Sequence, residues 1–169
     1  MLASLLLALA PAALVVAAVT DLAERKISNR LTIGLALAYP LVALAVGMGP
    51  AAIGQGLMIG FGLLALGFAL FALGVIGGGD AKLIAAVGPW MGASAFPEFM
   101  FYTACAGGAL SVLALALRSM RSQTAPLPIT VWVERFVPEK PGLPYGVAIA
   151  AGGLLAYPHS SLVVRMFSA

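Results

Sequence analysis

The sequence predicts an all-α membrane protein whose chain crosses the bilayer about six times. Of its 169 residues, 62% are hydrophobic and 9% are charged, whereas soluble domains contain about 25% charged residues. The mean hydropathy is +1.08, and the apolar residues form uncharged runs long enough to span a hydrocarbon core, which takes about 20 residues. No polar stretch is long enough to form a separate core, so we expect one membrane-embedded domain over residues 1–169.

Six apolar segments define the expected helices. The first, residues 2–20, has no basic residue ahead of it and is long enough to span, so we expect a retained membrane helix and not a signal peptide. The others are residues 31–48, 51–76, 80–92, 97–117 and 143–164. The fourth segment is the shortest, and Gly88-Pro89 within it predicts a kink or a helix end at that point.

The positions of the basic residues predict the orientation in the membrane. The loops after the first, third and fifth segments hold eight of the nine Lys and Arg residues, and in a six-helix chain these loops face the same side. By the positive-inside rule that side is the cytoplasm, so both termini are expected to be external. Residues 119–142 form the longest cytoplasmic loop, and its mixed segment 131–137 is expected either at the interface or as ordinary solvated loop.

Two aspartates stand at the edges of the apolar runs. Asp21 follows the first run, and Asp80 follows a second uncharged run that ends in three glycines. Charges at the edge of lipid are costly and are therefore candidates for function. The predicted topology places both aspartates at the cytoplasmic ends of their helices. The alternative is that each only marks the membrane boundary, with Lys82 as a local partner of Asp80.

A pair of carboxyl groups at one depth can perform acid/base chemistry. Two adjacent carboxyls share one proton, so the ionised member can accept a proton from water while the protonated member donates one. Nucleophilic and metal-dependent schemes have less support, because the chain has one cysteine, Cys105, and one histidine, His159, expected on the opposite face. We expect no cofactor, no metal and no nucleic-acid partner.

Glycines are concentrated near Asp80 and in the third segment. Residues 77–79 remove three Cβ atoms ahead of Asp80, which permits positive φ angles and close approach of an extended peptide; a flexible turn is the alternative. Gly56 and Gly60 form a small-xxx-small pattern, which permits close helix contact either within the chain or between two copies.

Three motifs together resemble a known family. Asp80 lies in Gly-Gly-Gly-Asp-Ala-Lys-Leu (residues 77–83), which matches the GxGD motif of intramembrane-type aspartyl proteases in the form used by type IV prepilin peptidases. Residues 21–31 resemble that family's first motif, in which an aspartate ends helix one and a basic stretch follows. Residues 143–152 resemble the opening of the last helix, especially in the small peptidases of Flp (tight-adherence) pilus systems.

The resemblance implies a GxGD aspartyl protease fold and a function. The chain would be an inner-membrane endopeptidase that removes the leader of a prepilin or pseudopilin at the cytoplasmic face, working beside pilus or secretion assembly machinery. Asp21 and Asp80 would form the catalytic pair. The residues implied in substrate or backbone approach are Gly77, Gly78, Gly79, Lys82, Asn29, Tyr145 and Gly146.

The sequence also departs from the family pattern. Ser28 stands where many relatives have proline, which predicts a looser turn after Asp21. The chain begins directly with the first apolar run and lacks the cysteine metal motif of the bifunctional relatives, so we expect cleavage without N-methylation.

Two other kinds of function stay open. One is an ion-coupled transporter or channel that uses the two aspartates as ion ligands, although both lie near one face and no inverted repeat is evident. The other is a non-enzymatic scaffold of a secretion system. The sequence does not determine which aspartate carries the shared proton.

Overall fold

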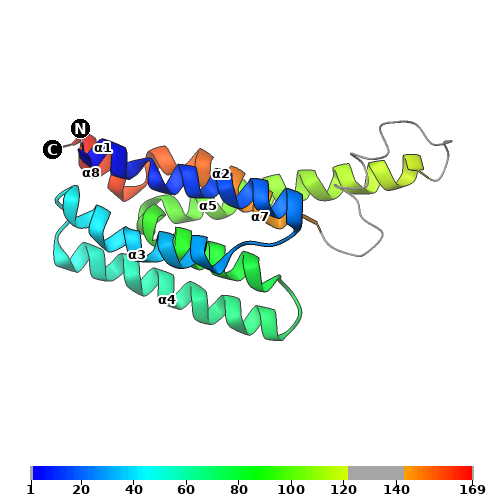
Figure 1. Cartoon of the computed structure of the whole chain (residues 1–169), viewed down its shortest axis with the longest axis horizontal. Coiled ribbons are helices and arrows are strands. Elements are labelled where there is room, and N and C mark those ends of the chain that lie inside the picture. The colour runs from blue at the N-terminus through cyan, green and yellow to red at the C-terminus, as the bar shows by residue number, and fades with distance from the viewer. Residues whose placement is uncertain (1, 122–142, 169) are drawn as a thin grey trace.

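The computed structural model describes residues 2–121 and 143–168, and every regular element in them is helical (Figure 1). The elements, in chain order, are α1 (Leu2–Leu7), α2 (Leu9–Glu24), α3 (Asn29–Ala45), α4 (Pro50–Ala72), α5 (Gly78–Arg121), α7 (Tyr145–Ala156), η1 (Tyr157–His159) and α8 (Ser161–Phe167). The predicted all-α class is confirmed. Most of the predicted loop over residues 119–142, including its segment 131–137, lies outside the described residues.

The described helices are those of a polytopic membrane protein, as predicted, although the number of described stretches long enough to cross a membrane is not six. Four stretches are long and apolar enough to cross a membrane, and α3 is a shorter apolar helix. The four stretches are Leu5–Glu24, Pro50–Ala72, Gly78–Leu117 and Tyr145–Phe167. The count differs because the predicted fourth and fifth segments are joined in the single long element α5, and because α3 has only 17 residues.

A break inside α5 reverses the direction of the chain. Gly92 has φ 67° and ψ 177°, outside the helical region, and the two halves of α5 run in opposite directions from it (Figure 1). A Cβ at Gly92 would collide with the Oγ of Ser161, and positive φ itself favours glycine. The predicted kink at Gly88-Pro89 is therefore displaced: Pro89 lies inside the helix, and the break comes three residues later.

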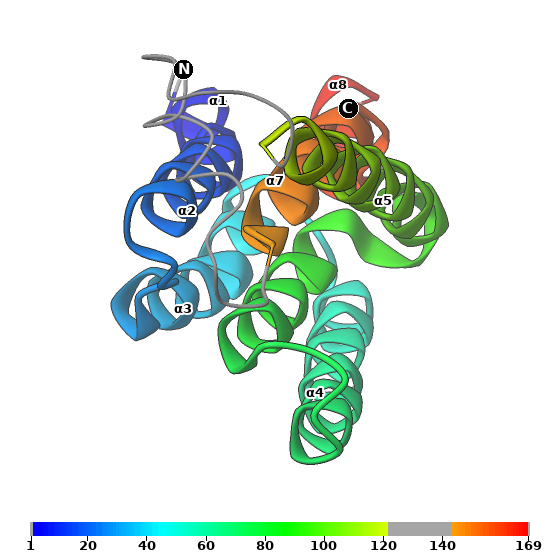
Figure 2. The ribbon, with the colours of Figure 1, turned by 90° about the vertical axis from the view of Figure 1, so that its right-hand side faces the viewer.

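The first half of α5 lies at the centre of the helix bundle. It separates α3 from α4, whereas its second half lies beside α7, which in turn packs on α2 (Figure 2). Trp90 in the first half is fully buried. Its indole N–H donates to the backbone oxygen of Leu35 at 3.1 Å, and its ring meets the ring of Tyr39 edge-on. This buried contact fixes α3 against α5.

The small-xxx-small pattern of α4 is used within the chain. A Cβ at Gly56 would overlap the ring of Tyr39, and a Cβ at Gly60 would lie 2.8 Å from Cγ of Pro89. Small residues let helix backbones approach closely in membranes. The pattern therefore seats α4 against the first half of α5 and against the Tyr39 side chain that reaches it from α3.

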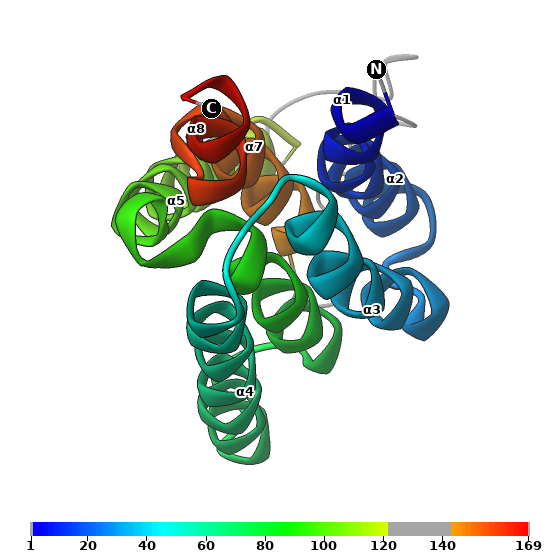
Figure 3. The same ribbon diagram turned by 90° about the vertical axis from the view of Figure 1, so that its left-hand side faces the viewer.

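The two ends of the bundle differ in what they carry. Both termini lie at one end (Figures 1 and 3), where the Nδ1 atom of His159 lies 2.7 Å from Oε2 of Glu98. The loop from α2 to α3 and the loop from α4 to α5 lie at the other end (Figure 1). The 12 residues of α7 lie between the Asp21 end and the His159 end, a length of roughly 18 Å at 1.5 Å per residue. His159 is thus remote from Asp21.

Candidate active site

Asp21 lies in the last turn of α2 and points into the protein. Its exposed fraction is 7%, which is unusual for a residue that only marks a membrane boundary. Its Oδ2 atom accepts a hydrogen bond from the backbone N–H of Gly146, at 2.8 Å. Arg25, which ends α2 in the left-handed conformation (φ 55°), adds a favourable charge interaction with the carboxylate. Asp21 is therefore held by the neighbouring helix α7 and by the C-terminal end of its own helix, α2.

Glycines in α7 allow α2 to come this close. Gly146 and Gly153 are seven residues apart, as are Asp21 and Leu14 on α2, and seven residues are about two helical turns. A Cβ at Gly146 would lie 2.8 Å from Oδ2 of Asp21, and one at Gly153 would lie 2.7 Å from Cδ1 of Leu14. The two antiparallel helices thus meet at two matched points, and a larger residue at either point would require the facing side chain to shift.

Asp80 has different surroundings. It lies in the first turn of α5 and is half-buried. Its side chain folds back over the preceding glycines, because a Cβ at Gly77 would lie 2.8 Å from its Oδ2 atom. Within the described part of the chain, its carboxyl group accepts no hydrogen bond that would fix it.

The glycines at residues 77–79 leave space around Asp80, but their backbone φ angles are not unusual. Among the described glycines only Gly47, Gly74 and Gly92 have positive φ, so residues 77–79 do not adopt the positive φ that glycine permits. The left-handed residue of this turn is Gly74, three positions earlier. Gly79 instead packs against Ile27, whose Cβ would lie 3.4 Å from an added Cβ.

The fold brings Asp21 and Asp80 together at the end of the bundle that carries the loops. They are 59 positions apart in sequence, yet Asp21 near the end of α2 and Asp80 near the start of α5 lie at the same end of the bundle (Figure 1), near enough for the charge of Asp21 to influence Asp80. Two carboxyls can share a proton and activate a water molecule once they come within hydrogen-bond reach, either directly or through that one water. In the described residues, no three His, Cys, Asp or Glu side chains gather as a metal site would require.

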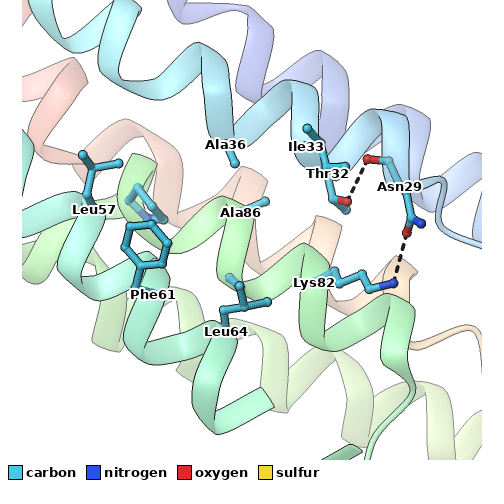
Figure 4. A pocket seen from close by; sticks show the side chains of 12 residues that line it. Asn29, Thr32, Ile33, Ala36, Leu57, Phe61, Leu64, Lys82 and Ala86 are labelled. Atoms are coloured by element: carbon cyan, nitrogen blue, oxygen red, sulfur yellow. Dashed lines mark hydrogen bonds between the residues drawn. The ribbon is translucent and has the colours of Figure 1, made fainter. Parts of the chain in front are cut away.

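Two further predicted residues contact each other beside this pair. The ammonium group of Lys82 donates to Oδ1 of Asn29 at 3.1 Å (Figure 4), and so links the first turn of α3 to the start of α5. Lys82 is therefore not the ion-pair partner of Asp80, the alternative that the sequence had left open. Ser28 caps α3 by accepting a hydrogen bond from the N–H of Arg30 at 3.2 Å. The turn after Asp21 is closed by this cap, although proline is absent.

In the third motif, residues 143–152, Gly146 contacts the aspartate site directly, whereas Tyr145 does not. Tyr145 is 36% exposed, and its ring packs over Gly107 in the second half of α5, where an added Cβ would lie 2.7 Å from the ring. Gly146 contacts Asp21 itself. The sequence predicted Gly146 only as a site of substrate approach, and its role as a hydrogen-bond donor was missed. The available signal was a glycine in the first helical turn, where backbone N–H groups have no partner within the helix.

The fold and this site define a polytopic helical membrane protein with a carboxyl pair near one end of its helices. The sequence profile of the type IV leader peptidase family matches residues 8–112, a stretch that contains both aspartates. The chain belongs to this family, and the predicted relation is confirmed at that level.

Two curated relatives agree with the family assignment. They are the proteins named prepilin leader peptidase/N-methyltransferase of Burkholderia pseudomallei strains 1026b and K96243. Each is 37% identical to the chain over 78 residues, which are 46% of this chain and 20% of the relative. The chain thus spans about a fifth of the length of these relatives. No solved structure matches it significantly.

Proposed function

We propose that this protein is a membrane aspartic endopeptidase that removes the leader of a prepilin or pseudopilin, with Asp21 and Asp80 as the catalytic pair. The observation that supports the proposal is that both carboxyls lie at one end of the helix bundle, Asp21 in the last turn of α2 and Asp80 in the first turn of α5, in a chain of the type IV leader peptidase family. The substrate class follows the name of the relatives. The likeness of residues 143–152 to small Flp-system peptidases makes an Flp-type prepilin the first substrate to test.

The reaction proceeds through one water molecule. The ionised carboxylate takes a proton from the water, whose oxygen attacks the carbonyl carbon of the scissile peptide. The protonated carboxyl gives its proton to the carbonyl oxygen, which yields a neutral tetrahedral diol. The carboxyl that took the water proton then gives it to the leaving nitrogen, while the other carboxyl takes a proton from a hydroxyl of the diol. The C–N bond breaks to give a carboxylic acid and an amine, and the pair is left with one proton.

The hydrogen bonds at the site support a division of roles. Asp21 accepts the Gly146 N–H at 2.8 Å, and a donor aimed at a carboxylate favours its ionised form. No described residue donates a hydrogen bond to Asp80. We therefore assign the base to Asp21 and the proton carrier to Asp80.

The charges of the loops support the orientation. Arg25, Lys26 and Arg30 lie at the end of the bundle that holds the aspartates. By the positive-inside rule this end faces the cytoplasm, and the protein lies in the inner membrane. A leader that has not been translocated would present its cleavage bond at this depth, and the exposed Gly77 leaves room for an extended backbone.

Co-expression with an Flp-type prepilin tests the proposal. Leader removal is followed by gel shift and by mass spectrometry of the new N-terminus. Asp21→Asn and Asp80→Asn keep the size of the side chain but cannot complete the proton cycle, so each should lower processing by about 10²–10⁴-fold. The matched control is Glu24→Gln, which removes an exposed carboxylate at the same end of α2 and should process normally.

Two outcomes would contradict the proposal. Wild-type processing by either aspartate variant would remove that carboxylate from the catalytic pair. Intact prepilin in the presence of the wild-type protein, combined with ion flux in proteoliposomes that Asp80→Asn abolishes, would favour the transporter function.

A further inference from the structure

A cavity of about 340 Å³ lies between α3, α4 and the first half of α5, close to the aspartate pair (Figure 4). We call it the α3–α4 groove. Its wall residues are Asn29, Thr32, Ile33, Ala36, Leu57, Gly60, Phe61, Leu64, Lys82, Ala85, Ala86 and Pro89. Because α3 and α4 barely contact each other, the groove is closed on its inner side by α5 and open on its outer side.

The groove is amphipathic along its length. Its polar side chains, Asn29, Thr32 and Lys82, lie together at the end that also holds the aspartates, and the remaining wall is apolar. Figure 4 shows Phe61 and Leu64 of α4 directed toward α3 and α5. Phe61 is 70% exposed and Leu64 is 44% exposed, in a helix apolar enough to span a membrane. The open side of the groove therefore faces lipid.

The charge at the polar end is not neutralised within the described part of the chain. The Lys82 ammonium donates one hydrogen bond, to the neutral amide of Asn29 at 3.1 Å, and an ammonium has three N–H groups to donate. The hydroxyl of Thr32 is already engaged with the backbone oxygen of Asn29 at 3.2 Å. A ligand for this end thus needs an anionic acceptor, which Lys82 would hold.

The size and lining of the groove suit a thin, apolar ligand, because its volume is about 340 Å³ and nine of its twelve wall residues are apolar. A single hydrocarbon chain is thin enough to lie along the apolar wall. Basic pockets between membrane helices on the cytoplasmic side are suited to anionic lipid head groups.

From this combination we infer that the α3–α4 groove binds an anionic phospholipid, with one acyl chain along Ala36 and Phe61 and the phosphate at Lys82. The lipid would fill the gap between α3 and α4. It would also brace the first turn of α5, which carries Asp80, against α3. The inference concerns a lipid site and does not depend on leader cleavage.

Photolabelling in vesicles tests the lipid site. The full chain is reconstituted in phosphatidylcholine with a trace of phosphatidylglycerol that carries a photoreactive acyl chain, and labelled peptides are identified by mass spectrometry. We expect label on residues 57–64 of α4, displaced by unlabelled phosphatidylglycerol more readily than by phosphatidylcholine. Glycerol phosphate should not displace it, because the acyl chain supplies the apolar contact.

Variants distinguish the groove from general lipid contact. Lys82→Gln should weaken competition by phosphatidylglycerol about fivefold, the effect of one basic residue at a membrane surface. Ala36→Trp should remove the label by filling the groove. The matched controls are Lys26→Gln, which removes an exposed charge at the same end, and Leu37→Trp, which enlarges an exposed neighbour outside the groove. Both controls should label normally.

Three results would overturn the inference. One is label spread evenly over all exposed helices, and another is equal competition by both lipids. The third is unchanged labelling in Lys82→Gln and Ala36→Trp; if these variants also lost prepilin processing, the groove would belong to the substrate. Loss of labelling with intact processing would leave the proposed peptidase function untouched.

Discussion

The two aspartates of the site differ in how the protein holds them. Asp21 is buried in α2, receives a backbone N–H from α7 and lies against Gly146 with no spare space. Asp80 is half-buried in the first turn of α5, after three glycines, and accepts no hydrogen bond from the described residues. One carboxyl is fixed by tertiary contacts, and the other is positioned mainly by its own turn.

This difference matches what a water-activating pair needs. A base must be ionised and correctly placed before substrate arrives, whereas the proton carrier must follow the carbonyl oxygen, to which it gives its proton and from which it later takes one back. A fixed Asp21 and an adjustable Asp80 meet these two demands. Substitutions around the two carboxyls should therefore have unequal effects.

The largest effect is expected where the contact is tightest. Gly146→Ala would place a methyl group 2.8 Å from Oδ2 of Asp21, and a displacement of about 1 Å in a catalytic group can cost about 100-fold in rate. We expect about 100-fold slower prepilin processing. The control is Gly108→Ala, whose added Cβ would meet nothing within 4 Å. Normal processing by Gly146→Ala would mean that Asp21 is not held rigidly.

A smaller effect is expected beside Asp80. Gly77→Ala also brings a methyl group to 2.8 Å from a carboxyl oxygen, but the Asp80 side chain can rotate away. A rotamer shift costs about 0.5–1.5 kcal/mol, so processing should fall about threefold to tenfold. Measured initial rates for the two alanine variants compare the sites directly. An equal loss of processing rate in Gly77→Ala and Gly146→Ala would contradict the difference between a fixed Asp21 and an adjustable Asp80.

A weaker effect is expected at the link between α3 and α5. Asn29→Ala removes the acceptor of Lys82 and leaves Asp21 untouched. Because both side chains are exposed, the hydrogen bond contributes at the low end of the usual range, about 0.5 kcal/mol. Processing should fall about twofold, and crosslinking of cysteines introduced at positions 21 and 80 should become slower. A loss as large as that of Gly146→Ala would make Asn29 part of the catalytic machinery.

The smallest effect is expected at the opposite end of the bundle. His159→Gln removes the contact with Glu98, in which the two side chains are 62% and 46% exposed. Exposed ion pairs contribute about 0–1 kcal/mol to stability. Processing should stay within about twofold of wild type, the scale of so small a change, and thermal unfolding should shift only slightly. A strong loss of processing would mean that the contact between His159 and Glu98 influences the aspartates at the other end of the bundle.

Residues 2–20 and 51–76 show which part of the fold could be predicted from the sequence. Their length and lack of charge predicted membrane helices. The first segment corresponds to α1 and α2 together and the second to α4, each with shifted ends. Segments interrupted by glycine and proline were less predictable. Gly92 and not Gly88-Pro89 breaks α5, because Gly92 meets Ser161 of a distant helix, a contact that no local pattern contains.

The sequence by itself determined the class of protein and the two candidate carboxyls. Apolar run length, loop charge and the residues around Asp21 and Asp80 are local properties, which act before any helices meet. Only the tertiary structure decided how the carboxyls are held. The N–H that orients Asp21 comes from Gly146, 125 positions away, and the α3–α4 groove exists only where three helices pack. Such features depend on the closeness of helix crossings, which small residues permit and which the order of residues along one helix does not specify.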